Sequence, residues 1–464
     1  MKSSILISAG LLFSIPGTLA APAPKFRQPR AIALASKPAN GTVKAKNKLE
    51  FYSIMLESNE TRSWNDFFGD MGYNHTDLEE MKHTLDFRSF GCEKTFRSFG
   101  MMMTAEEVED MGNIEGVALV QKPFVYTSPE MPPWDETDVV IHDFLAPQNV
   151  SLHGRQLNQQ VPLGQPKKQT NTVWGLQRIS SSQPVRPVGK GPKEFGYQYT
   201  YSSQEGSGVD VYVLDGGLNQ HQEFGQRGKR LWSYWAKDEN DDTGHGTHCA
   251  GTIGGLYVGA AKNANIWGVK ILKKGASYGD SLTNGIEEVL ASHVKRRTDP
   301  EFRGSVINLS VGKMGPDPFQ RAVLQRASKA GVHIVVAASN YGTDACKYTP
   351  AMYARELPII SVGAMDIRDQ RRPDSNFGPC VTIFAPGTDI MSANSRDPKG
   401  YIPKSGTSMA APLVAGMVAD LLSKKPEFKE NPQGLKNYLV QTGFPNVVKD
   451  ARGPAPLANN GFQN

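Results

Sequence analysis

Short apolar runs recur along residues 169–464, and stretches with helical periodicity separate them. The runs are continuous rather than alternating, as expected of parallel strands that are buried on both faces of a sheet. Helical patterns lie between them at 280–297, 317–330 and 408–423. This alternation predicts an α/β fold with a doubly wound, mostly parallel sheet and flanking helices. The apolar runs are VDVYVL, NIWGVKIL, SVINLSV, VHIVVAA, PIISVGA and VTIFA.

The pattern before this region divides into four segments. Residues 1–20 combine one lysine, an apolar run and small residues at the end, which is the pattern of a secretory signal peptide. Residues 21–47, rich in Ala, Pro and Lys, predict a disordered leader. Residues 48–127 alternate strand and helix patterns and predict a small α+β domain, with a capping box in TAEE and a last strand over VALVQKPFVYT. The Pro- and Gln-rich residues 128–168 predict a linker and processing region.

Composition narrows the function. The net charge of +5 is small for 464 residues, so nucleic-acid binding is not expected. No later apolar run approaches the roughly 20 residues of a membrane-spanning helix, so no membrane span is expected. The signal pattern predicts entry into the secretory pathway, and secretion, the cell wall and the vacuole are all compatible with it. Sequons for N-glycosylation lie at Asn40, Asn59, Asn74 and Asn149.

Three polar residues stand out against the apolar pattern. Asp215 ends the run VDVYVLD and precedes two glycines, which is either a simple turn or the carboxyl end of a strand, where sites of α/β folds lie. His245 opens a helix of small residues in DDTGHGTHCAG. Ser408 begins an apolar helix in SGTSMAAPLVAG, either as an N-cap or as a reactive hydroxyl at the positive end of the helix dipole.

The order Asp215, His245, Ser408 is the chain order of the subtilisin triad. Together with NLSVG and VVAASN, these motifs resemble the subtilisin-like serine proteases, or subtilases. TNTVWGLQRISS, the cysteine in GHGTHCAG and FGPCVTIFAPGTDI are most similar to the proteinase K-like branch, common in fungi. The resemblance implies a peptidase domain over 169–464 and an inhibitory propeptide over 48–127.

The resemblance also implies a role for each matching residue. Ser408 would attack the peptide carbonyl and form an acyl-enzyme, His245 would act as general base and then acid, and Asp215 would orient the imidazole. Asn340 matches the oxyanion-hole asparagine. The expected partners are polypeptide substrates and the chain's own propeptide, with the protein a monomer. The substrate-binding positions implied are Gly275, Ser310, Val311, Gly312, Ala337, Ala338 and Ser339.

Several positions depart from the family pattern, among them Gly216, Ser339 and Thr382. Gly216 follows the aspartate where the family has Thr or Ser, which removes a hydroxyl that could support Asp215. Ser339 replaces a glycine in an uncharged pocket stretch, so we expect broad hydrophobic specificity with reduced activity on the largest aromatics. Thr382 stands where relatives have a calcium-binding aspartate, and it lacks the carboxylate that hard cations favour. We therefore predict no metal site and no cofactor, and calcium binding stays an open alternative.

The chain has four cysteines. Cys346 and Cys380 match positions that are bridged in some relatives, and Cys92 lies in the expected propeptide. Cys249 follows His245 by four residues, which places it on the same helix face. It is expected to be free, either as a small packing residue or as a thiol whose modification disturbs the histidine.

Three alternative functions compete with this interpretation, and the sequence motifs argue against the last two. A subtilase relative that is weak or inactive as a catalyst would bind peptides or act as a chaperone. A lipase-like hydrolase needs Gly-x-Ser-x-Gly, whereas Met409 and Ala410 follow Ser408. A nucleotide-binding fold needs Gly-x-Gly-x-x-Gly directly after a strand, and no strand of this sequence has it.

Overall fold

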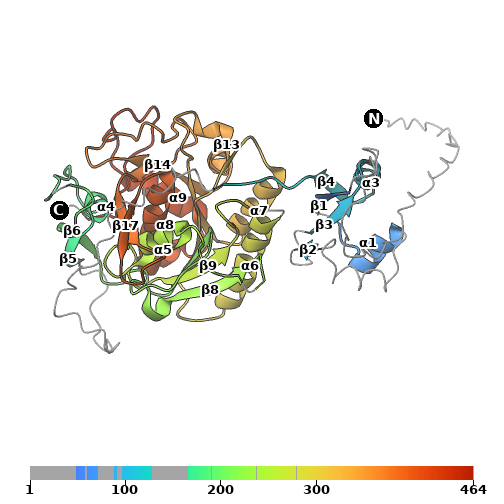
Figure 1. The fold of residues 1–464 in the computed structure, drawn as a ribbon, viewed down its shortest axis with the longest axis horizontal. Helices are drawn as coiled ribbons and strands as arrows, with labels where there is room; N and C mark the ends of the chain where they lie inside the picture. Colours follow the sequence, from blue (N-terminus) through green and yellow to red (C-terminus); the bar gives the residue numbers. More distant parts are fainter. Residues whose placement is uncertain are drawn as a thin grey trace, which may run out of the picture.

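The computed structural model describes residues 49–57, 60–71, 88–90, 97–127, 166–189, 191–236, 238–277 and 280–462. They form a small N-terminal domain and a larger domain (Figure 1). The expected signal peptide and leader, most of the expected linker, the four sequons and Cys92 lie outside the described residues.

A seven-stranded sheet forms the centre of the larger domain, in the order β15-β14-β12-β10-β7-β9-β8. Every neighbouring pair is parallel, and the central strands are buried along their whole length. This confirms the α/β fold class. The strands are β7 (Val209–Asp215), β8 (Gly228–Ser233), β9 (Asn265–Lys270), β10 (Gly304–Leu309), β12 (His333–Ala337), β14 (Ile359–Met365) and β15 (Ile383–Pro386).

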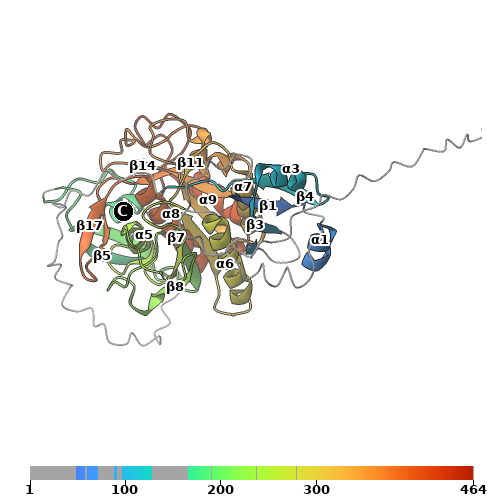
Figure 2. The same ribbon diagram turned by 45° about the vertical axis from the view of Figure 1, so that its right-hand side comes forward.

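Helices cover both faces of this sheet (Figures 1 and 2). Helices α6 (Ser281–Arg296) and α7 (Pro318–Lys329) pack into the apolar cluster on one face. On the other face lie α4 (Trp174–Ile179), α5 (His245–Gly254), α8 (Thr407–Lys424) and α9 (Pro432–Thr442). Helix α8 is buried on nearly all sides, which explains why its sequence is apolar all round.

Smaller elements surround the sheet. The antiparallel pair β5–β6 begins at Pro166, within the range expected to be linker, so the end of that range belongs to the folded domain. The paired strands are β5 (Pro166–Thr172) with β6 (Tyr197–Ser202), β11 (Lys313–Met314) with β13 (Tyr348–Thr349), and β16 (Ile390–Ala393) with β17 (Tyr401–Lys404). The 3₁₀ helices are η2 (Gly225–Arg227), η3 (Ala345–Lys347), η4 (Ala351–Arg355) and η5 (Pro426–Phe428).

Among the described residues, the N-terminal domain consists of an antiparallel sheet of order β2-β3-β1-β4 and the helices α1 and α3. The expected capping box of Thr104 and Glu107 is present at the start of α3. The elements are β1 (Glu50–Leu56), α1 (Trp64–Asp70), β2 (Arg88–Phe90), β3 (Ser98–Met103), α3 (Ala105–Gly112) and β4 (Val117–Gln121).

The last strand of this domain is shorter than the sequence predicts. The apolar run continues to Thr127, but β4 ends at Gln121, shortly before Pro123, which has no N–H for a sheet. Residues 122–127 instead leave the small domain and reach the larger one (Figure 1). Within the described residues, no helix is both long and apolar enough to cross a membrane.

Candidate active site

Asp215 is the last residue of β7 and is completely buried. Its Oδ1 accepts a hydrogen bond from the Gly216 backbone N–H at 2.7 Å, and its Oδ2 lies 2.8 Å from Nδ1 of His245. The position after Asp215 is crowded, because a Cβ on Gly216 would lie 3.0 Å from Oδ1 of Asp241. Thus a backbone N–H contacts Asp215 even though the hydroxyl that relatives carry here is absent.

His245 is the first residue of α5, and the chain turns into this helix at Gly244 with φ 71°. Gly246 permits the close approach of α5 to β7, since a Cβ there would lie 2.4 Å from the Gly217 carbonyl oxygen. Asp241 holds the helix start by accepting from the N–H groups of Gly244 at 2.9 Å and Thr247 at 2.7 Å.

The environment of His245 favours a protonated imidazole. Burial disfavours the charged ring, but the adjacent Asp215 carboxylate and Cys249 outweigh it and raise the pKa of His245 well above its ordinary value. A general base must be neutral to accept a proton. The arrangement therefore suits a reaction that becomes faster as the pH rises and His245 loses its proton.

Ser408 lies in the first turn of α8, which follows Gly406 at φ 145°. Its hydroxyl donates to the Ser310 carbonyl at 3.5 Å, and Nε2 of His245 has no hydrogen-bond partner among the described residues. The structure thus forms the Asp215–His245 bond but not a bond from Ser408 to His245. Such catalytic bonds are often loose without substrate and tighten in the complex.

The Asn340 side chain is fixed at the start of the same helix. Its Oδ1 accepts from both the N–H and the hydroxyl of Thr407, at 2.9 and 2.8 Å, which leaves Nδ2 as the group available to donate. A Cβ on Gly406 would lie 2.9 Å from this Nδ2, so glycine keeps the space beside the amide open. Since the first N–H groups of a helix lack intrahelical acceptors, Asn340 and the Ser408 N–H can serve one anionic oxygen together.

Two backbone edges flank the site. Ser310, Val311 and Gly312 follow the end of β10, and Gly275 lies in a turn closed by hydrogen bonds between Lys273 and Ala276. Thr127 lies between these edges and forms antiparallel bridges to both Gly312 and Ala276. The edges therefore hold an extended chain in this structure.

The expected pocket residues follow the end of β12. Ala337, Ala338 and Ser339 are all buried and carry no charge. Ser339 has φ 76°, in the left-handed region that favours glycine. Its hydroxyl oxygen would lie 2.7 Å from a Cβ on Gly312, so the serine fills space between the pocket and the backbone edge.

Two buried charges near the site were not anticipated from the sequence. Asp241 precedes His245 by four residues, and Lys404 ends β17 four residues before Ser408. Burial lowers the pKa of Lys404 to about 8, although Asp241, Cys249 and Asp215 oppose this shift. Nothing in the run YIPK marks Lys404 as buried, because a lysine at the end of a short strand looks ordinary in the sequence.

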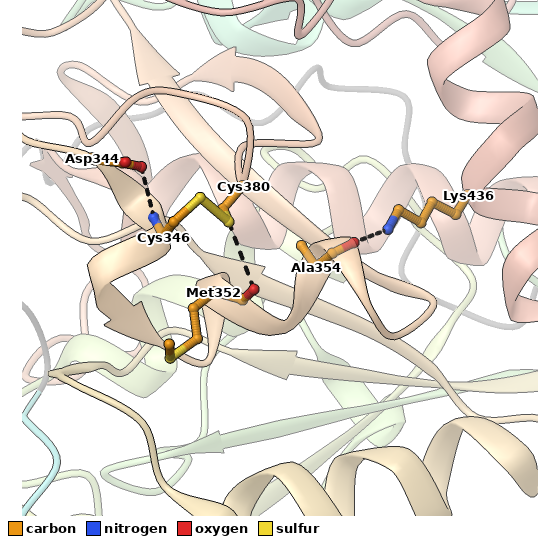
Figure 3. The surroundings of a disulfide bond; sticks show 6 residues. All are labelled: Asp344, Cys346, Met352, Ala354, Cys380 and Lys436. Carbon is orange, nitrogen blue, oxygen red and sulfur yellow. Dashed lines mark hydrogen bonds between the residues drawn. A yellow bond between two sulfur atoms is a disulfide. The ribbon is translucent and has the colours of Figure 1, made fainter.

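The cysteines are arranged as the resemblance implied. Cys346 and Cys380 form a disulfide that ties η3 to the segment before β15 (Figure 3). Cys249 is free and buried, with its sulfur 4.0 Å from Nδ1 of His245 and 3.3 Å from the Ser408 carbonyl oxygen.

Thr382 offers no carboxylate, and its hydroxyl accepts a hydrogen bond from the Ser361 N–H at 3.1 Å. Within the described residues, one group of His, Cys and acidic side chains has ligand atoms within 4.8 Å of one another, namely Asp215, His245 and Cys249. The Asp215–His245 hydrogen bond accounts for that proximity.

An Asp–His pair at a strand end near a serine in the first turn of a buried helix, in a parallel α/β fold, is an arrangement typical of serine hydrolases. The profile of the subtilase family, the S8 peptidases, matches residues 206–462. The chain belongs to the subtilase family, which confirms the resemblance.

Relatives agree with this assignment. The chain is 39% identical over 307 residues to the "Subtilisin-like serine protease Rho m 2.0101" of Rhodotorula mucilaginosa, covering 62% of this chain and 85% of that protein. It is 36% identical over 318 residues to "Alkaline protease 2" of Aspergillus fumigatus, covering 64% of this chain but only 61% of that protein. The crystal structure of a cold-adapted subtilisin-like serine proteinase matches with a TM-score of 0.54 and 34% identity, over 63% of this chain and 99% of that one.

Proposed function

We propose that this protein is a serine endopeptidase that cleaves polypeptides through an acyl-enzyme. The observation that carries the proposal is the buried Asp215–His245 hydrogen bond beside Ser408 at the start of α8. Ser408 would attack the scissile carbonyl while His245 takes its proton and later delivers it to the leaving amine. Asp215 would hold the imidazole with Nε2 toward Ser408 and stabilise its cation.

The oxyanion formed in this attack needs donors that are already in place. Nδ2 of Asn340 and the Ser408 N–H supply them, because Thr407 fixes the Asn340 amide and the helix start aligns its N–H groups. The uncharged residues after β12 support broad specificity for apolar side chains at the residue before the cut. No step of this mechanism requires a metal or cofactor.

We also propose that the enzyme is made as a zymogen. Residues 48–127 would act as the intramolecular inhibitor, and the bridges of Thr127 to Gly312 and Ala276 support this, because they occupy the edges that a substrate would use. Cleavage between 127 and 169 would release the peptidase domain as a monomer. The signal pattern of residues 1–20 supports entry into the secretory pathway.

The Ser408→Ala variant of the full chain tests both proposals. Maturation should be autocatalytic, so this variant should accumulate as an unprocessed precursor in a host without related proteases. Peptidase activity should fall by about 10⁶-fold, the loss known for the nucleophile of subtilisin.

A serine-directed fluorophosphonate should label the wild type and not Ser408→Ala. Normal processing of the variant would exclude autocatalysis. Absence of labelling in the processed wild type would favour the inactive, peptide-binding alternative.

A further inference from the structure

The segment Tyr126–Thr127 lies on the larger domain as a bound peptide would. Thr127 donates to the Gly312 carbonyl at 3.4 Å and accepts from the Gly312 N–H at 3.1 Å. Tyr126 accepts from the N–H of Ser277 at 2.8 Å and donates to the Ser277 hydroxyl at 2.7 Å. The chain is therefore held from both sides in one defined register.

The position of Ser408, the proposed nucleophile, shows which substrate position each residue of the segment occupies. The Ser310 carbonyl oxygen is 3.5 Å from Oγ of Ser408, and Gly312 lies two residues further along the same edge. In an antiparallel pair, a peptide residue opposite Ser310 lies two positions after the one opposite Gly312. A substrate in this register would place the last residue before the cleaved bond opposite Ser310. The third residue before that bond would then lie opposite Gly312. The place of Tyr126 is then the fourth position before the cut.

The Tyr126 side chain fills a polar-ended pocket. It is 3% exposed and belongs to the same buried apolar cluster as Leu272, Leu282 and Val311. Its hydroxyl donates to Oδ2 of Asp317. Burial, followed by the charge of Asp317, raises the pKa of Tyr126 well above its ordinary value, so the hydroxyl stays protonated and able to donate.

Asp317 is held in place independently of Tyr126. It is 4% exposed and is the N-cap of α7, with Oδ1 accepting from the Gln320 N–H at 3.1 Å. The Tyr353 hydroxyl accepts from the Asp317 N–H at 2.7 Å and donates to its carbonyl at 2.8 Å. The carboxylate would therefore keep its position when another peptide replaces the segment.

We propose that Asp317 makes this pocket selective for tyrosine at the fourth position before the cleaved bond. The proposal rests on the proposed peptidase function and names a specificity-determining residue for it. A tyrosine would donate its hydroxyl to Asp317, as Tyr126 does. A phenylalanine would fill the same space but would desolvate the carboxylate without a donor, and sites built to bind a hydroxyl discriminate strongly against its absence.

The test compares two peptide substrates on the enzyme that the full chain yields on processing. One is acetyl-Tyr-Ala-Ala-Leu joined to a fluorogenic amine, and the other has Phe in place of Tyr. We expect kcat/KM to be about tenfold higher for the tyrosine peptide in the wild type, the size expected for a hydrogen bond to a charged group. In Asp317→Ser, which keeps a capping hydroxyl for α7 but is too short to reach the tyrosine, the ratio should fall to about one.

The ratio of kcat/KM for the tyrosine and phenylalanine peptides separates a change in specificity from a change in folding. Damage to α7 would lower kcat/KM for both peptides and leave the ratio unchanged. Asp317→Asn retains an acceptor oxygen and should give an intermediate ratio. Asp344→Ser is the matched control, since Asp344 caps η3 through the Cys346 N–H at 2.9 Å, and there the tenfold ratio should persist. A wild-type ratio near one, or an unchanged ratio in Asp317→Ser, would overturn the proposal. Failure of the wild type to cleave either peptide would instead overturn the proposed function.

Discussion

At the scale of single residues, the site is an arrangement of buried charges whose balance sets the pH dependence. Asp215 and Asp241 are both buried near the start of α5, and the buried Lys404 interacts electrostatically with both. Arg396 and Cys249 also interact with Lys404. The pKa of His248 is lowered mainly by burial and further by the charge of Lys404. The proposed base, His245, therefore titrates within a network of buried charges rather than beside Asp215 alone.

Replacing Lys404 by Met should shift the acid limb of the pH–activity profile. Lys404 interacts with Asp215, the partner of His245. A cation beside this pair disfavours the imidazolium, so its removal should raise the pKa of His245 further and move the acid limb of the profile up by about half a pH unit. The wild-type and Lys404→Met profiles should converge above pH 8, because Lys404, with a pKa of about 8, is then neutral.

The measurement is kcat/KM from pH 5 to 10. Lys436→Met is the control, since Lys436 on α9 is a half-buried lysine whose pKa burial likewise lowers to about 8. Its profile should match the wild type. The lowered pKa of Lys404 also means that its neutral form is favoured by folding, so this residue should make the free energy of unfolding rise with pH between about 8 and the ordinary lysine value of 10.5.

Cys249 should make this serine protease sensitive to mercurials. Its sulfur lies 4.0 Å from Nδ1 of His245, so a bulky adduct would displace the ring that activates Ser408. Burial raises the pKa of Cys249, which keeps the reactive thiolate scarce, so inhibition should develop over minutes rather than at once.

The comparison is time-dependent inhibition by an organomercurial in the wild type and in Cys249→Ala. The variant should resist, because the other described cysteines form the Cys346–Cys380 disulfide. Equal inhibition of both proteins would assign the effect to another group.

At the scale of elements, the sequence predicted the central sheet and its main helices because their signals are local. Continuous apolar runs marked β7, β10, β12 and β14, and the apolar, serine-led pattern marked α8. The predicted end of the last strand was wrong because the apolar pattern of VALVQKPFVYT resumes after Pro123, whereas residues 122–127 leave the sheet. Of these residues only Tyr126 is buried, and it packs into a cluster of the larger domain. An apolar run in the sequence does not show which domain its residues contact.

The residues of the candidate site also divide into those that the sequence predicted and those that it did not. Asp215, His245 and Ser408 could be found because glycines and small residues frame each one, and the structure brings Asp215 and His245 into contact. Lys404 and Asp317 could not be found from the sequence, because their importance comes from residues that are distant in the sequence and meet them only in the folded protein. A lysine in a short edge strand and an aspartate before a helix look ordinary in the sequence.

The segment after β12 allows a test of the pocket shape. Ser339 adopts φ 76°, which strains any residue with a Cβ, so Ser339→Gly should raise the free energy of unfolding by about 1 kcal/mol. The loss of its side chain should also widen the pocket and raise kcat/KM several-fold for large aromatic residues before the cut, relative to alanine.

Ser339→Ala separates the two effects because it keeps the Cβ and the strain but lacks the hydroxyl. It should gain no stability from relieved strain, as measured by denaturant unfolding. If Ser339→Gly also leaves the aromatic-to-alanine ratio unchanged, Ser339 does not border the pocket.

At the scale of the whole molecule, the two domains meet through a short tether as well as through side chains. The N-terminal domain has its own apolar core around Phe67, Phe68 and Phe99, separate from the two clusters that flank the large sheet. Tyr126 and Thr127 extend beyond that core into the edges of the larger domain. The proposed inhibition therefore depends on contacts that can be weakened without damage to either core.

Thr127→Pro should release the proposed inhibition early. Proline removes the N–H that donates to the Gly312 carbonyl and fixes φ, so it weakens the antiparallel pairing at the point nearest the triad. The loss of one backbone hydrogen bond with local distortion should weaken the inhibitory contact about tenfold. In freshly purified protein, activity on a small peptide substrate should then appear after a lag about tenfold shorter than in the wild type.

Thr127→Val is the matched control, because it keeps the N–H and the branched shape and changes only the hydroxyl. Its lag should equal that of the wild type. Thr127 lies outside the apolar core of the N-terminal domain, so both variants should fold with equal yield. If Thr127→Pro folds normally and keeps the wild-type lag, the bridges to Gly312 and Ala276 do not carry the inhibition, and the contacts of Tyr126 with Ser277 and Asp317 become the ones that hold the segment in place.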